Sequence, residues 1–326
     1  MKRLIIPILA LIIAVVVILS IAHDNRDKAF LLEQGISPMP AGYTEEALEQ
    51  GTLEVLSYNT TMLVTEKKLK RNAMVYLPKG YDPNNRYNIL YLIHGRGGDY
   101  RTWLGTPDRP RKFKNVLDHM IQDKVIEPTI VIAPGLNYLY GEDELIMEGI
   151  CNEITSELMP AAESKYSTYA SGTDAKAFAA SRDHRIVAGF SMGGSATWHI
   201  MKDHIDYFRY FIPMSMAMYY DRVGYSEEKS IRASEEISEA IAKSGYEPED
   251  YEVYAATGTE DHKAEATDMQ VFDLIDEHVF HFSELGLQKG NITFKIWPGN
   301  WHSYTQSYAY LYNALKEFNN GKGFKE

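Results

Sequence analysis

The stretch Arg185-Ile-Val-Ala-Gly-Phe-Ser-Met-Gly-Gly194 decides the fold of this chain. It is a short apolar run that ends in the pattern G-x-S-x-G, and the residues after it are typical of a helix. A serine on a sharp strand-to-helix turn has its hydroxyl exposed at the end of a sheet, and small neighbours let the backbone turn without a Cβ clash. The order strand, turn and helix therefore makes Ser191 the candidate nucleophile.

The runs around this stretch predict an α/β protein. The inner runs are continuously apolar, as in parallel strands buried on both faces, whereas the first two alternate and predict antiparallel strands at the edge. The expected strands are Leu53–Tyr58, Asn72–Leu77, Asn88–Ile93, Thr129–Ala133, Arg185–Gly189, Tyr210–Met214, Glu252–Ala256 and Thr293–Trp297. The expected helices are Asn115–Asp123, Glu148–Ser164, Met192–Lys202, Ser226–Lys243, Ala264–Leu285 and Tyr304–Phe318. Together they predict a mostly parallel eight-stranded sheet with helices on both faces, the α/β-hydrolase fold.

The N-terminus is expected to lie outside this fold. Met1-Lys-Arg3 is basic, and the apolar run Leu4–Ala22 that follows predicts export of the rest of the chain. Residues 1–22 fit either a cleaved signal peptide or a membrane anchor. Residues 23–51 are polar and predict a linker, and residues 52–326 are long enough for one hydrolase domain.

Composition excludes several functions. The formal net charge of −12 argues against a nucleic-acid partner, since phosphate binding needs a basic face. Cys151 is the only cysteine, so neither an intrachain disulfide nor a cysteine-based zinc site is expected. It lies in a helix-like stretch without a sharp turn, which favours a buried free thiol over a nucleophile. The histidines show no set of ligands at motif spacing, so we expect no metal and no cofactor.

A serine nucleophile needs a base, and the base needs a carboxylate to orient it. In this fold the three groups come in the order serine, acid, histidine, each after a strand. His302 follows the last expected strand and precedes the last helix, where the base belongs. Glu260 and Asp261 compete for the acid on the loop after the preceding strand, and we prefer Asp261 because a shorter carboxylate is aimed more rigidly.

The intermediate of acyl transfer needs two N–H donors for its oxyanion. One is expected to be the amide of Met192, directly after the nucleophile. The other is expected on the loop Leu92-Ile-His-Gly-Arg-Gly-Gly98, at the amide of Arg96 or alternatively of Gly97. His94 in this loop is expected to be a structural hydrogen-bonding residue.

From about Asn72 to Phe318 the chain resembles the esterase-D-related α/β hydrolases, and above all the feruloyl esterases of carbohydrate esterase family 1. The motifs that carry the resemblance are Val75-Tyr-Leu-Pro-Lys-Gly-Tyr81, Leu90-Tyr-Leu-Ile-His-Gly-Arg-Gly-Gly98 with Trp103 just after it, Glu157-Leu-Met-Pro-Ala-Ala-Glu-Ser-Lys-Tyr166, Gly189-Phe-Ser-Met-Gly-Gly194, Gly258-Thr-Glu-Asp261 and His302. The resemblance implies hydrolysis of hydroxycinnamoyl or acetyl esters on plant cell-wall xylan, without metal or cofactor. It also implies that the acid follows the glycine by three, which supports Asp261.

Several alternatives stay open at this stage. An acetyl xylan esterase, a siderophore esterase and an S-formylglutathione hydrolase share these motifs, although the export signal argues against the last. A hydrolase-like binding protein without turnover is a different class, and a fluorophosphonate label on Ser191 would separate it from an enzyme. Aromatic residues in the loops suit stacking on a sugar or aryl ring, and we expect Trp103 to contact the substrate, although such side chains also pack loops.

Overall fold

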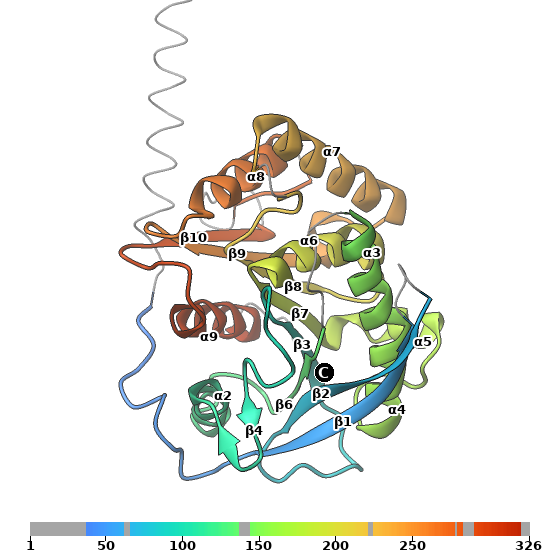
Figure 1. Cartoon of the computed structure of the whole chain (residues 1–326), viewed down its shortest axis with the longest axis vertical. Helices are drawn as coiled ribbons and strands as arrows, with labels where there is room; N and C mark the ends of the chain where they lie inside the picture. The colour runs from blue at the N-terminus through green and yellow to red at the C-terminus, as the bar shows by residue number, and fades with distance from the viewer. Residues whose placement is uncertain are drawn as a thin grey trace, which may run out of the picture. The chain divides into compact units, whose positions relative to one another are not determined.

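Eight strands form one sheet in the order β1-β2-β6-β3-β7-β8-β9-β10. They are β1 (Thr52–Thr61), β2 (Lys68–Leu77), β3 (Asn88–Ile93), β6 (Thr129–Pro134), β7 (Arg185–Phe190), β8 (Tyr210–Met214), β9 (Glu252–Gly258) and β10 (Ile292–Trp297). β1 and β2 are antiparallel, β2 is antiparallel to β6, and all the other neighbours are parallel. The predicted α/β-hydrolase fold and its eight strands are therefore confirmed (Figure 1).

This computed structural model describes residues 37–61, 66–136, 144–220, 224–277, 279–282 and 290–320. The described helices are α2 (Lys112–Gln122), α3 (Glu144–Asn152), α4 (Met159–Lys165), α5 (Ala175–Ala180), α6 (Met192–His204), α7 (Glu227–Ser244), α8 (Ala264–Asp276) and α9 (Tyr304–Asn320). A π-helical turn, η1 (Glu153–Leu158), joins α3 to α4, and short 3₁₀ turns lie at Arg182–His184 (η2) and Pro248–Asp250 (η3). A small hairpin of β4 (Gly105–Thr106) and β5 (Arg109–Pro110) precedes α2.

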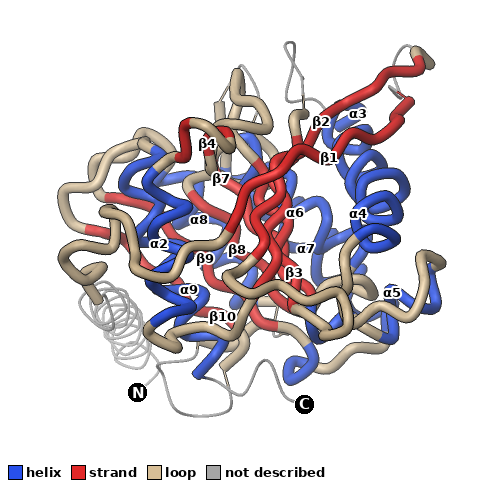
Figure 2. Tube along the Cα trace, turned by 90° about the horizontal axis from the view of Figure 1, so that it is seen from below, coloured by secondary structure: helices blue, strands red, loops and turns tan. Residues whose placement is uncertain are grey.

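Helices cover both faces of the sheet. α6 packs on β7 and β8 together with α3 and α7, whereas α9 packs on the other face together with α2. Figure 2, seen from below, shows the twisted sheet running between these two helical layers. β3 and β7 are buried at every position, which accounts for the apolar runs that follow their first residues, Asn88 and Arg185.

The start of β7 is fixed by a buried ion pair. Arg185 bonds Glu163 through Nε at 2.8 Å and donates to the carbonyl oxygens of Phe178 and Tyr207. Breaking such a pair by removing one partner costs about 3–5 kcal/mol, because the other charge stays buried. The strand that leads to Ser191 is therefore held firmly at its other end.

Two boundaries differ from those expected. Residues 38–51, which we assigned to a linker, belong to the same compact unit as the sheet, since that unit begins at Pro38. Tyr43 stacks on His119 at 4.9 Å, and the amide of Gly51 donates to Asp118 at 2.7 Å. The polar composition of this segment did not predict these contacts, because a few buried groups are enough to hold such a segment against the domain.

The predicted helix Ala264–Leu285 is too long, since α8 ends at Asp276. Further on, Phe280 and Phe282 are buried, and Phe282 forms a parallel bridge with Ile292 of β10. Burial at every second residue is the period of an extended chain and not of a helix.

The N-terminal expectations concern another part of the chain. Residues 1–22, expected to be a signal peptide or anchor, lie outside the described residues. Within the part of the chain that the structure describes, no helix is both long enough and apolar enough to cross a bilayer.

Candidate active site

Ser191 lies on a sharp turn between β7 and α6. Its φ of 56° is in the left-handed region, which is strained for a residue with a side chain. Its amide donates to the carbonyl of Met214 at 2.9 Å, and its own carbonyl accepts from Gly194 at 2.7 Å and Ser195 at 3.1 Å. The turn is thus held from both sides, as in the nucleophile elbow of α/β hydrolases.

Two glycines make this turn possible. A Cβ on Gly189 would lie 2.0 Å from the carbonyl oxygen of Gly193, and a Cβ on Gly193 would lie 2.6 Å from that of Ile93. Both distances are far below van der Waals contact. The glycines of the G-x-S-x-G pattern therefore allow α6 to start directly against β7 and β3.

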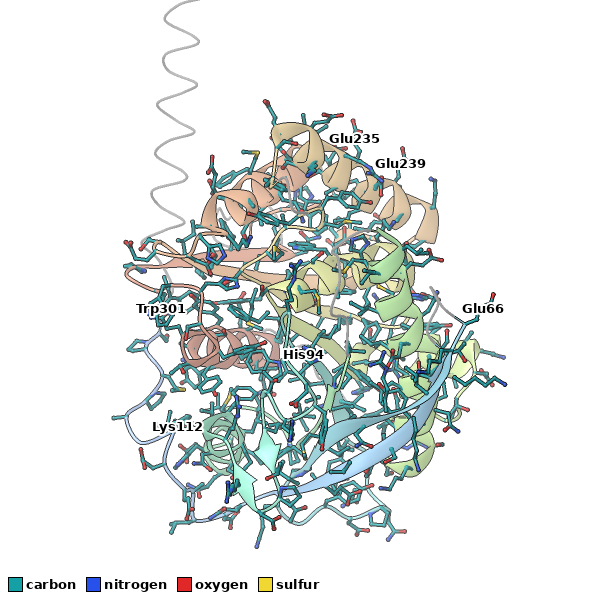
Figure 3. All side chains as sticks on the ribbon, in the orientation of Figure 1. Glu66, His94, Lys112, Glu235, Glu239 and Trp301 are labelled. Carbon is teal, nitrogen blue, oxygen red and sulfur yellow. The ribbon has the colours of Figure 1, made fainter. Side chains whose placement is uncertain are left out.

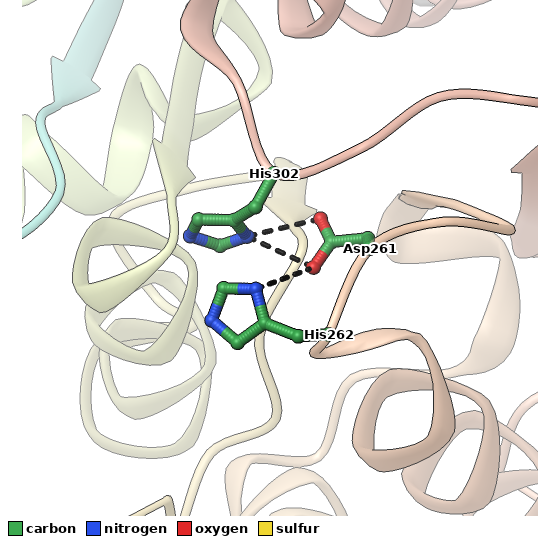
Figure 4. A group of neighbouring side chains, drawn as sticks. All are labelled: Asp261, His262 and His302. Atoms are coloured by element: carbon green, nitrogen blue, oxygen red, sulfur yellow. Dashed lines mark hydrogen bonds and ion pairs between the residues drawn. The ribbon is translucent and has the colours of Figure 1, made fainter.

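His302 and Asp261 meet at the carboxyl ends of neighbouring parallel strands. Nδ1 of His302 lies 2.9 Å from Oδ1 and 3.0 Å from Oδ2 of Asp261 (Figure 4). The ring of His302 also contacts that of Phe190, the residue before Ser191, with centroids 4.5 Å apart. Since β7, β8, β9 and β10 are successive parallel neighbours, the loops that carry all three expected catalytic residues share one edge of the sheet.

The environment of Asp261 keeps it ionised. The side chain is buried, with 5% of the residue exposed, and burial alone raises the pKa of a carboxyl group. Three interactions outweigh that effect: the hydrogen bond with His302, the electrostatic attraction of the His302 ring, and the amide of Lys263, which donates at 2.8 Å. The pKa of Asp261 therefore lies below its usual value. Glu260, the competing acid, is exposed on the same loop. Of the two carboxylates, the structure brings Asp261 to the histidine.

The loop after β3 lies over Ser191. A Cβ on Gly95 would be 3.1 Å from Cβ of Ser191. The amide of Gly95 donates to the hydroxyl of Tyr304 at 2.7 Å, so it is already engaged. The next residue, Arg96, is exposed. On the other side of the serine, Met192 is the first residue of α6, where amides have no partner within the helix.

His94 has two partners in this loop. Nδ1 lies 2.7 Å from the carbonyl oxygen of Gly95, and Nε2 accepts from the amide of Leu136 at 3.1 Å. Because a carbonyl only accepts, Nδ1 carries the proton in a neutral ring, and burial lowers the pKa of His94 accordingly. These contacts agree with the structural role expected for it.

Cys151 is a buried free thiol, as expected, and burial raises the pKa of the thiol.

Trp103 does not lie where a substrate contact requires. Its side chain is 0% exposed, it donates from Nε1 to the carbonyl of Ile93 at 3.2 Å, and its ring meets that of Tyr304 edge to face at 4.9 Å. The prediction that Trp103 contacts the substrate is therefore wrong, and Trp103 is a core residue beneath the loop of Gly95. The sequence places an aromatic residue near the site but does not tell which way it faces.

Replacing Trp103 with alanine should destabilise the fold by about 3–5 kcal/mol, because the change empties a fully buried indole site. Urea unfolding monitored by circular dichroism measures this change. A variant of unchanged stability with a raised KM would instead restore the substrate contact.

Four residues of this region were not anticipated from the sequence. Tyr304 holds the amide of Gly95, and burial raises its pKa to about 12, so its hydroxyl stays protonated. Ser215 is fully buried directly after β8, with a φ of 55°. Its hydroxyl lies near enough to Asp261 to help lower the pKa of that carboxyl group, although the geometry is not that of a regular hydrogen bond. His262 lies beside His302, and Trp301, just before the histidine, is 59% exposed at the periphery of the molecule (Figure 3). No motif marks such neighbours: Ser215, His262 and Trp301 are ordinary loop residues by type, and Tyr304 is an ordinary tyrosine at the start of α9.

The fold and the elbow serine define an α/β hydrolase. The chain belongs to the Esterase family, whose model matches residues 65–317. The family resemblance inferred from the sequence is thereby confirmed.

Similar proteins include two that are named as xylanases. Endo-1,4-beta-xylanase Y of Acetivibrio thermocellus is 36% identical over 298 residues, which are 90% of this chain and 26% of that protein. An endo-1,4-beta-xylanase/feruloyl esterase of Xylanibacter ruminicola is 27% identical over 200 residues, which are 55% of this chain and 26% of that protein. The chain thus spans about a quarter of the length of these relatives.

A similar solved structure is the feruloyl esterase module from Clostridium thermocellum in complex with sinapinate. It is 33% identical with a TM-score of 0.75, and the match covers 90% of this chain and 96% of the module. The likeness therefore extends over a whole esterase module and not over a fragment of one.

Proposed function

We propose that this chain is an exported serine esterase that cleaves feruloyl and related hydroxycinnamoyl esters of plant cell-wall xylan. The observation that carries the catalytic part is the hydrogen-bonded pair of His302 and Asp261 at the edge of the sheet where Ser191 forms its turn. The substrate part is supported by a similar module bound to sinapinate, which is a hydroxycinnamate, and by relatives named as xylanases.

Acylation follows from the tautomer of His302. Because a carboxylate only accepts, Nδ1 of His302 carries a proton toward Asp261 and Nε2 keeps a free lone pair. Nε2 takes the proton from Ser191 as its Oγ attacks the ester carbonyl, and Asp261 stabilises the imidazolium that forms. The same proton then passes to the departing alcohol, leaving the acyl group on Ser191. In the second half of the reaction, Nε2 takes a proton from a water molecule as its oxygen attacks the acyl carbonyl. The proton then passes to Oγ of Ser191, and the carboxylic acid is released.

Two amides are assigned to the oxyanion. The amide of Met192 stands at the N-terminus of α6, where the helix dipole also favours negative charge. For the second donor we keep Arg96, because the preceding amide on the loop is engaged by Tyr304. Its side chain takes no part in this role.

Because Trp103 is buried in the core, we assign the aromatic contact with the substrate to Trp301 instead. Three of the four tryptophans are buried, whereas Trp301 is exposed and directly precedes His302. Trp301 is the chain neighbour of the proposed base, and an exposed indole at this position suits stacking on the aryl ring or the sugar of a bound substrate.

Methyl ferulate should be cleaved with a higher kcat/KM than an acetyl ester of comparable leaving group. A stacked ring contributes about 0.5–1.5 kcal/mol beyond burial, which corresponds to a two- to tenfold preference. Trp301→Ala should narrow the gap, and Leu48→Ala, which removes another exposed apolar side chain, is the control. Initial rates with both esters measure this ratio. Release of acetate from acetylated xylan without release of ferulate would favour the acetyl-esterase alternative and leave the catalytic residues untouched.

Export completes the proposal. Residues 1–22 carry the basic start and apolar run of an export signal, and a polymeric substrate such as xylan is met outside the cell. A fusion of residues 1–30 to a reporter that is active only outside the cytoplasm tests this part.

A further inference from the structure

A second histidine lies against the pair of His302 and Asp261. Nδ1 of His262 is 3.9 Å from Oδ1 of Asp261, and the rings of His262 and His302 are 4.6 Å apart at an interplanar angle of 63° (Figure 4). The side chain of His262 is 63% exposed, whereas the carboxylate beneath it is fully buried. Two imidazoles and one carboxylate therefore converge at a point that solvent reaches from the side of His262.

The spacing of their ligand atoms suits a metal ion. One nitrogen from each imidazole and one oxygen of Asp261 lie within 4.8 Å of one another. Bonds of about 2.0–2.2 Å in a tetrahedral site set neighbouring ligand atoms about 3.4 Å apart. The exposed ring of His262 has room for the small shift required, and water would complete the fourth position. Among the described residues, no other three such groups converge in this way.

We propose that Asp261, His262 and His302 form a binding site for a divalent transition-metal ion of the Zn²⁺ type, and that its occupation inhibits the esterase. Imidazole nitrogen and carboxylate oxygen are ligands that Zn²⁺ and Cu²⁺ accept readily. Mg²⁺ and Ca²⁺ require more oxygen ligands than this site offers, so they should not compete. The inhibitory half of the proposal rests on the proposed function.

A metal ion bound to either ring nitrogen of His302 would inhibit the enzyme. If Nδ1 binds the ion, its proton moves to Nε2, which then has no lone pair for the proton of Ser191. If Nε2 binds the ion, that lone pair is used directly. The bond between His302 and Asp261 is lost in the first case, and the base is lost in both.

The test uses the full chain, stripped with EDTA and desalted. Zn²⁺ should inhibit hydrolysis of a short p-nitrophenyl ester, EDTA should restore the rate, and Mg²⁺ at the same concentration should have no effect. His262→Ala should raise the Zn²⁺ concentration for half-inhibition at least 10- to 100-fold, since loss of a group that merely orients a ligand already costs that much affinity. His281→Ala is the matched control, because His281 lies beside the start of β10, at the opposite end of that strand from His302. Each variant is compared with its own metal-free rate.

Isothermal titration calorimetry with Zn²⁺ separates binding from catalysis. Wild type and His281→Ala should bind one ion with equal affinity, and His262→Ala should bind it at least tenfold more weakly. Equal binding by all three proteins would overturn the site, and binding that depends on His262 without inhibition would overturn the inhibitory role. A protein that hydrolyses none of the esters yet binds Zn²⁺ through His262 would refute the proposed function and leave the metal site standing.

Discussion

Ser191→Ala is expected to lower kcat by about three to six orders of magnitude while the fold stays intact. The serine, its base and its acid act as a unit, so removal of the nucleophile abolishes the acyl-enzyme route altogether. The backbone at Ser191 is strained in the same way with either side chain, because alanine also has a Cβ at a φ of 56°. Thermal unfolding should therefore change little.

Two measurements check this expectation. Steady-state kinetics with methyl ferulate give kcat, and a fluorophosphonate label followed by mass spectrometry should modify wild type at Ser191 but not the variant. Ser164→Ala is the matched control, since Ser164 is an exposed serine on α4, and it should retain normal rates and labelling. More than a few per cent of activity in a stable Ser191→Ala protein would mean that another residue is the nucleophile.

The strands were predictable because burial on both faces leaves a direct trace in the sequence. β3 and β7 are buried throughout and are apolar after their first residues, Asn88 and Arg185, as expected of short central strands. The turn at Ser191 was predictable for a similar reason, since only small residues fit where α6 meets β7. In both places a steric requirement restricts the residue types so strongly that their order identifies the structure.

The misplaced features lack such a restriction. Trp103 follows the loop that ends at Gly98 and Trp301 directly precedes His302, so both lie near a motif, yet Trp103 is buried and Trp301 is exposed. The contact between His262 and His302 joins two loops that are 40 residues apart, and it depends on how β9 and β10 pair. Single-residue patterns carry no information on the direction of a side chain in a loop, so the lining of the site had to come from the structure.

The second large effect is expected at Asp261. Asp261→Asn should lower kcat by about 10⁴, because an amide facing Nδ1 of His302 favours the wrong tautomer and withdraws the charge that stabilises the imidazolium. Glu260→Gln should change kcat much less, since Glu260 is exposed and does not replace the contact that Asp261 makes. The two variants differ by one position on one loop, so each is the control of the other.

The size of the difference also distinguishes catalysis from folding. Asp261 is buried and its carboxylate accepts from Lys263 at 2.8 Å, so an asparagine there keeps one acceptor oxygen for that amide and nearly the same volume. Urea unfolding of both variants, run beside the kinetics with methyl ferulate, should therefore show a modest loss of stability that is far too small to account for a 10⁴-fold loss of rate. Because the ester is held by other groups, KM should change little while kcat falls. If Glu260→Gln loses the larger part of kcat and Asp261→Asn does not, the acid is Glu260, and the loop must rearrange around His302 before catalysis.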